Sequence, residues 1–182
     1  MARAAAGLRA LRRLLDALYM AGGVIAAGFL LAILGLIVAQ MVARWTGHVV
    51  PGASDYAGYC MASASFFAFA HALDRGAHIR VGLLLTVLGR HRRWAEIWAM
   101  AVGAVTATFF ARYAVKGTYW SWKLGDVSQG LDRTPLWIPQ LSMAAGTVLL
   151  AICFWDHLIR LIATGHDGIR SEQAEDLPAG PR

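Results

Sequence analysis

Charged side chains are scarce in this sequence. Asp, Glu, Lys and Arg together make up 15% of the 182 residues, whereas hydrophobic residues make up 58%. Ordinary soluble domains carry about 25% charged residues. This shortage argues against a water-soluble globular domain, so we interpret the chain as an integral membrane protein.

Cysteine is also rare, and the sequence contains no motif that is typical of an enzyme. Cys60 and Cys153 both lie in apolar stretches, where a free cysteine acts as a small hydrophobic residue rather than half of a disulfide. We find no metal-ligand cluster, no phosphate-binding glycine loop and no Ser/His/Asp spacing. The net charge of +6 comes without any nucleic-acid-binding module. We therefore expect no catalysis, no cofactor, no metal and no nucleic-acid partner.

Four long stretches contain few or no charges. A membrane helix needs about 20 mostly apolar residues, and residues 17–43, 56–73, 94–115 and 136–155 approach or exceed this length. The sequence thus predicts an all-α integral membrane protein with four transmembrane helices in a single domain, residues 1–165. Residues 166–182 are polar and contain Pro and Gly, which indicates a flexible cytoplasmic tail.

Basic residues are concentrated in two of the connections. The segment before the first span has four arginines and the second connection has five, whereas the first and third connections have fewer. Short basic connections stay in the cytoplasm, so both termini are predicted to be cytoplasmic. The basic residues of the second connection are Arg75, Arg80, Arg90, Arg92 and Arg93.

The second connection also contains a short apolar segment. Residues 79–88, IRVGLLLTVL, are too few to cross a bilayer and group their apolar side chains on one broad arc of a helix. We expect an amphipathic helix in the plane of the membrane, followed by lipid-interface residues Arg90, Arg92, Arg93 and Trp94. Arg112, near the outer end of the third span, is expected to reach the lipid interface as well.

These features together resemble a known family. A long first span is followed by a second that ends in AHALDRGAHIRVGLLL, then by a basic turn, a third span, and an outer loop that leads into LDRTPLWIPQLSMAAGTVLLA. This order resembles the small membrane subunit, DctQ-like, of tripartite ATP-independent periplasmic (TRAP) transporters. The most specific matches are Gly76, His78, Ile79, Arg80 and Val81 in the second connection, and Pro135, Trp137, Ile138, Pro139 and Gly146 at the fourth span.

The resemblance implies a function in the bacterial inner membrane. The small subunit would act as a scaffold for a large elevator-type subunit and help to dock a periplasmic substrate-binding protein, for sodium-coupled uptake of an organic acid. Expected contacts with the large subunit are Gly76, His78, Arg80, Leu84 and Leu85, although contact with lipid headgroups would explain His78 and Arg80 equally well. Lys123, Asp126, Asp132 and Arg133 are expected to contact the periplasmic partner.

Several alternatives remain open at this stage. Small residues of the first span permit close helix contact, either with the large subunit or within the chain's own bundle; they are Gly22, Gly23, Ala26, Ala27 and Gly28. His71 and His157 suggest a haem-binding four-helix cytochrome, although packing against neighbouring helices explains them more simply. An autonomous small transporter would need a polar path through the bundle, where the spans offer mainly Ser63, Ser65, Thr106 and Thr108.

Overall fold

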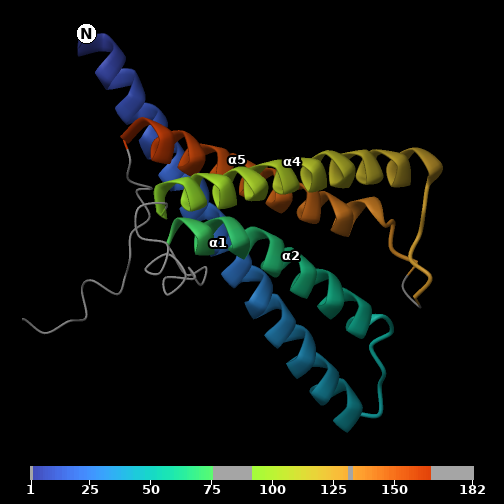
Figure 1. Cartoon of the computed structure of the whole chain (residues 1–182). Helices are drawn as coiled ribbons and strands as arrows, with labels where there is room; N and C mark the ends of the chain where they lie inside the picture. The colour runs from blue at the N-terminus through green and yellow to red at the C-terminus, as the bar shows by residue number, and fades with distance from the viewer. Residues whose placement is uncertain (1, 76–91, 131–132, 165–182) are drawn as a thin grey trace, which may run out of the picture.

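The chain folds into a bundle of long helices (Figure 1). The computed structural model describes residues 2–75, 92–130 and 133–164. Within these ranges the structure has four helices and one isolated antiparallel bridge, between Val127 and Pro135. The helices are α1 (Ala2–Trp45), α2 (Ala53–Asp74), α4 (Arg92–Leu124) and α5 (Trp137–Thr164). The all-helical prediction is confirmed, and the expected interfacial helix 79–88 lies outside the described residues.

The helices extend beyond the predicted spans. α4 continues to Leu124, past the predicted end at residue 115, so Lys116 and Lys123 lie on a helix and not in a loop. A charged residue marks where a helix meets water but does not break its backbone hydrogen bonds. α4 stops instead at Gly125, which has a φ of +67°, while the amide of Asp126 donates to the carbonyl of Ser121 at 3.0 Å. A left-handed glycine with this hydrogen bond is a common way to end a helix.

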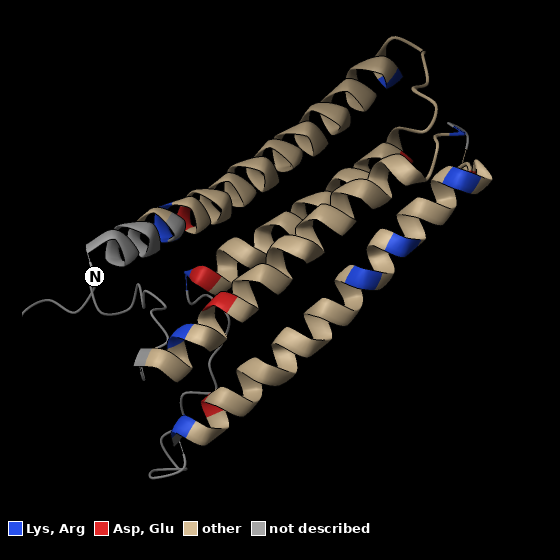
Figure 2. Ribbon diagram, turned by 90° about the horizontal axis from the view of Figure 1, so that it is seen from above, with Lys and Arg blue, Asp and Glu red and all other residues tan. Residues whose placement is uncertain are grey.

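Helix α5 connects the two halves of the bundle (Figures 1 and 2). α1 packs along α2, and both α2 and α4 pack on α5, whereas α1 makes a smaller contact with α5. Figure 2 shows α1 and α4 on opposite sides, with α2 and α5 between them. α2 and α5 run in the same direction, because Ser63 hydrogen-bonds Ser142 and Asp74 lies beside His157. We call the two ends of the bundle the Ser128 end and the His157 end.

Small side chains allow α2 to approach α5 closely. A Cβ atom at Gly146 would lie 2.7 Å from the carbonyl carbon of Phe66. The Cys153 thiol lies 3.5 Å from the carbonyl oxygen of Ala70 and donates to it. Tyr19 of α1 is fully buried in the same cluster. The core of the bundle is therefore the line where α1, α2 and α5 meet.

The small residues of α1 have different surroundings. A Cβ at Gly22 would lie 2.9 Å from Leu149, and one at Gly23 would lie 2.9 Å from the imidazole of His71. These two glycines thus serve packing within the chain's own bundle. A Cβ at Gly28 would meet nothing within 4 Å, so this part of α1 is open to another molecule.

The contact between α4 and α5 is also built on small residues. Ala107, Ala111 and Ala151 are buried between the two helices. A Cβ at Gly103 would lie 2.5 Å from the ring of Phe154. Alanine and glycine at these positions bring the two helix backbones close together, as is typical of helix pairs in membranes.

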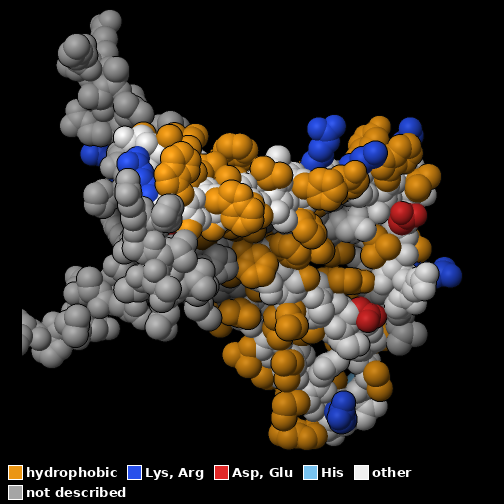
Figure 3. All heavy atoms as spheres, viewed as in Figure 1, with side chains coloured by type: hydrophobic (Ala, Val, Ile, Leu, Met, Phe, Trp, Pro, Cys, Tyr) orange, Lys and Arg blue, Asp and Glu red, His pale blue; other side chains and the backbone are white. Residues whose placement is uncertain are grey.

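The surface of the bundle is largely apolar. Three stretches are long and apolar enough to cross a bilayer, namely Arg12–Trp45, Arg93–Leu124 and Trp137–Ala163. α2 is not among them, although its 22 residues span about 33 Å. Figure 3 shows apolar side chains over the middle of the visible face and charged ones mostly toward its ends. The fold is that of a membrane protein.

Candidate partner-binding surfaces

The loop between α4 and α5 is fastened to the start of α2. The hydroxyl of Tyr59 donates to Ser128 Oγ at 2.7 Å, and Thr134 Oγ1 donates to the hydroxyl of Tyr56 at 3.0 Å. Tyr56 and Tyr59 lie on successive turns of α2, so one face of this helix binds both the first and the second half of the loop. The loop 125–136, which we call the outer loop, is therefore bound to three helices and not only to the two that it joins.

Backbone hydrogen bonds fold the outer loop into a narrow hairpin. The amide of Ser128 donates to the carbonyl of Thr134 at 2.8 Å, and the amide of Leu136 donates to the carbonyl of Asp126 at 3.0 Å. Ser128 Oγ also accepts the amide of Gly130 at 3.2 Å. Ser128 thus joins the turn of the hairpin to α2 through a single side chain.

The charged residues expected to meet a periplasmic partner gather at the Ser128 end. Lys123, Asp126 and Arg133 are all exposed, and Asp132 lies outside the described residues. The Lys123 ammonium lies 5.1 Å from the centre of the Trp120 ring, within the range of a cation–π contact. Arg133 has a φ of +47°, a conformation that is costly for a residue with a Cβ. The hairpin holds it there and turns its side chain to solvent.

Sequence reasoning missed the residues that hold this loop in place. From the sequence, Tyr56 and Tyr59 are predicted only to belong to the second span, and no role is predicted for Ser128 or Thr134. The spacing of three residues between Tyr56 and Tyr59 indicates that they share a helix face. Nothing in the sequence indicates that this face points at the loop.

The His157 end contains a cluster of polar side chains from three helices. His157 is fully buried, and its Nε2 lies 3.5 Å from the carboxylate of Asp74. His71 Nδ1 lies 3.2 Å from the carbonyl oxygen of Tyr19. Arg160 pairs with Asp156 one turn earlier on α5. These contacts account for both imidazoles as packing groups between helices.

A small polar cleft of about 100 Å³ opens beside this cluster. It is lined by basic and acidic residues of all three helices, including Arg12, Asp16, Asp74, Arg75 and Arg160. Within the described part of the chain, no three His, Cys, Asp or Glu side chains are placed to hold a metal ion. The cleft therefore has the mixed charge that suits a helix end at the membrane surface.

The residues expected at the lipid interface lie in different places. Arg93 and Trp94 are exposed at the start of α4, where the His157 end of the bundle begins. Arg112 is exposed as well, but α4 continues for twelve further residues beyond it. Figure 2 shows basic positions on the half of α4 toward the Ser128 end, on the side of the bundle far from α1. The side chain of Arg92 and all of Arg90 lie outside the described residues.

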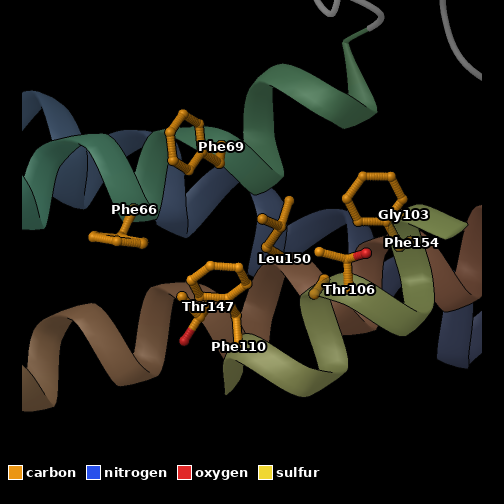
Figure 4. A pocket seen from close by; sticks show the side chains of 9 residues that line it. Phe66, Phe69, Gly103, Thr106, Phe110, Thr147, Leu150 and Phe154 are labelled. Carbon is orange, nitrogen blue, oxygen red and sulfur yellow. The ribbon is translucent and has the colours of Figure 1, made fainter. Parts of the chain in front are cut away.

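The residues expected to contact a large subunit, Gly76, His78, Arg80, Leu84 and Leu85, also lie outside the described residues. The described helices offer an apolar cavity of about 380 Å³ instead (Figure 4). Phe66 and Phe69 of α2 form one wall, Thr106 and Phe110 of α4 form another, and Leu150 of α5 lies between them. The side chains that line this cavity are almost all apolar.

A comparison of the sequence with models of protein families gives one match. The family model described as "Tripartite ATP-independent periplasmic transporters, DctQ component" matches residues 33–164. No curated protein and no solved structure matches at a significant level. The matched range runs from the last third of α1 to the end of α5, so it contains the outer loop, the second connection and most of the bundle. This chain belongs to the DctQ component family of the tripartite ATP-independent periplasmic transporters.

Proposed function

We propose that this chain is the small membrane subunit that fixes a TRAP transporter in place. It would hold the large, elevator-type membrane subunit and help to dock a periplasmic substrate-binding protein during sodium-coupled uptake of an organic acid. In this arrangement all four helices cross the bacterial inner membrane, and α2 crosses while covered by α1 and α5. Both termini are then cytoplasmic.

The fastening of the outer loop to α2 is the observation that carries this proposal. Two hydrogen bonds, from Tyr59 to Ser128 and from Thr134 to Tyr56, join the loop to a third helix. The contact of Gly146 with the backbone of Phe66, and that of Gly103 with the ring of Phe154, leave little room for the helices to slide. A rigid body with a fixed outer platform suits a scaffold better than a moving transport domain.

The distribution of arginine supports the proposed orientation. Arg12, Arg75, Arg93 and Arg160 belong to the His157 end, and the sequence of the connection that follows α2 adds further basic residues. Cytoplasmic connections are enriched in Arg and Lys. The Ser128 end, with Lys123, Asp126 and Arg133, then faces the periplasm, where the substrate-binding protein is found.

Co-purification tests the scaffold role. The chain would be expressed with the large membrane subunit encoded beside it, isolated through a tag on the small chain, and its complex mass determined. We expect a stable one-to-one complex, and sodium-driven uptake into vesicles only when all components are present. Vesicles that hold this chain alone serve as the control. Uptake by the chain alone, or its isolation without the large subunit, would contradict the proposal.

Two further experiments address the proposed contacts. In the second connection, Leu84→Asp combined with Leu85→Asp should reduce assembly and uptake together, because an apolar anchoring face would be lost.

At the outer loop, Asp126→Lys combined with Arg133→Glu should weaken binding of the periplasmic protein to the complex in nanodiscs, while Gln129→Lys on the same loop should have a smaller effect. Unchanged binding by the double variant would exclude this part of the loop from docking.

A further inference from the structure

A long groove runs between α4 and α5, and of the other described helices only α1 reaches it, through Leu15 toward the His157 end. It consists of a hollow of about 740 Å³ toward the His157 end and one of about 590 Å³ toward the Ser128 end. Val115 and Val148 line both hollows, so the two are continuous. On α5 the lining extends from Trp137 to Ile159, a rise of about 33 Å. The length of the groove therefore matches the thickness of the hydrocarbon core of a bilayer, about 30 Å.

The α5 wall of the groove has the spacing of a helix-packing surface. Its exposed residues recur at alternating intervals of four and three, which is the heptad pattern of one helix packed along another. Transmembrane helix pairs use the same left-handed geometry. These residues are Leu141, Ala145, Val148, Ile152, Trp155 and Ile159.

The α4 wall has the same spacing and includes a cation. The residues follow one another at intervals of four and three and are all exposed: Thr108, Arg112, Val115, Tyr119 and Trp122. The Thr108 hydroxyl accepts the indole N–H of Trp155 at 2.9 Å across the floor of the groove. This hydrogen bond fixes the two walls relative to each other.

Arg112 lies in the half of α4 toward the Ser128 end, and Lys116 follows it one helical turn later. Arg112 is about 28 Å along the helix from Arg93 and about 18 Å short of Leu124. It makes no ion pair or hydrogen bond with the residues that the structure describes. Asp156, which also lines the groove, is held by Arg160. A charged side chain that lines an apolar groove of a membrane helix normally faces a partner of opposite charge.

We infer that this groove receives one transmembrane helix of the large subunit, with a carboxylate placed against Arg112. The inference rests on the proposed function, which supplies the partner. A single phospholipid acyl chain covers only one leaflet, whereas the heptad spacing continues through both. A second copy of this chain, packed through the same face about a twofold axis, would set two Arg112 side chains into one interface, where like charges repel.

Substitutions in the groove and on another exposed helix face test the inference. Val148→Trp fills the groove, and Val105→Trp adds the same bulk to an exposed valine of α4 that lines neither hollow. Arg112→Glu reverses the charge, and Arg112→Lys retains it. We expect Val148→Trp and Arg112→Glu to lower the yield of the complex with the large subunit about tenfold, while Val105→Trp and Arg112→Lys stay near the wild-type yield.

A photo-crosslinking residue placed at Val148 identifies the occupant directly. The supporting result is an adduct with a transmembrane peptide of the large subunit that contains Asp or Glu. A lipid adduct or a dimer of this chain would overturn the inference, and so would unchanged complex yield with Val148→Trp and Arg112→Glu. If the wild-type chain does not bind the large subunit at all, the proposed function fails. If the wild-type complex forms but crosslinks elsewhere, only the groove assignment fails.

Discussion

Replacing Gly146 by alanine should force α2 and α5 apart. The new Cβ would lie 2.7 Å from the carbonyl carbon of Phe66 and 2.9 Å from its oxygen, whereas non-bonded carbon atoms prefer about 3.5–4.0 Å. Both atoms belong to the backbone, so no rotation of a side chain relieves the clash. The two helices must separate by about 1 Å along a line of small residues that is closely packed.

The size of the effect follows from two opposing terms. Overpacking of a closely packed core costs about 1–3 kcal/mol, and the higher helix propensity of alanine offsets about 1 kcal/mol of this cost. A net loss of up to about 2 kcal/mol corresponds to a midpoint of thermal unfolding lower by up to roughly 8 °C for a chain of this length.

The assay compares Gly146→Ala with a matched control. Gly117 lies inside α4, and a Cβ there would meet nothing within 4 Å. Gly117→Ala should therefore raise the free energy of unfolding by up to about 1 kcal/mol through helix propensity alone. Thermal unfolding of both purified variants in the same detergent, followed by tryptophan fluorescence, gives the two shifts. The reasoning is refuted if Gly146→Ala is as stable as Gly117→Ala.

Three further substitutions test the outer loop and the α4–α5 contact. Tyr59→Phe removes the hydrogen bond to Ser128, which should cost about 0.5–1.5 kcal/mol and speed hydrogen exchange of the loop amides; unchanged exchange would mean that the loop does not depend on this bond. Trp155→Phe removes the bond to Thr108 at a similar cost, measured as a lower unfolding midpoint, and an unchanged midpoint would show that the bond contributes nothing. Glycine suits the left-handed backbone at position 133, so Arg133→Gly should leave the free energy of unfolding unchanged or raise it by up to about 1 kcal/mol. The same substitution should weaken binding of the periplasmic protein. A clear loss of stability would argue that the Arg133 side chain supports the fold.

Much of the fold follows from hydrophobic patterning. The uncharged run at residues 17–43 leaves little choice other than a long membrane helix, and the runs within α4 and α5 are almost as clear. Helix ends were harder to place, because backbone hydrogen bonding continues through charged residues such as Lys116 until a residue such as Gly125 allows the chain to turn. α2 is the least certain span by composition, since packing between α1 and α5 favours Ala and Ser over larger apolar residues.

The candidate surfaces were predictable only in part. The charges Lys123, Asp126 and Arg133 could be assigned to one end of the molecule, because they lie between the same two spans. The bond from Tyr59 to Ser128 joins residues 69 positions apart, and it depends on how α2 is rotated toward the loop. Likewise, the spacing of Arg112 and Tyr119 on α4 could be read from the sequence, but their position in a groove requires knowing that α5 lies beside them.

The fastening of the outer loop has a mechanical consequence. Under the proposed function, a periplasmic protein that docks and leaves in each transport cycle exerts a sideways force on the loop. Because Tyr56 and Tyr59 hold the loop to α2, that force is shared among three membrane-embedded helices, and the hairpin does not swing as a free lever. The docked protein then keeps a constant height and direction above the membrane, so that its opening meets the moving part of the transporter at the same place in every cycle.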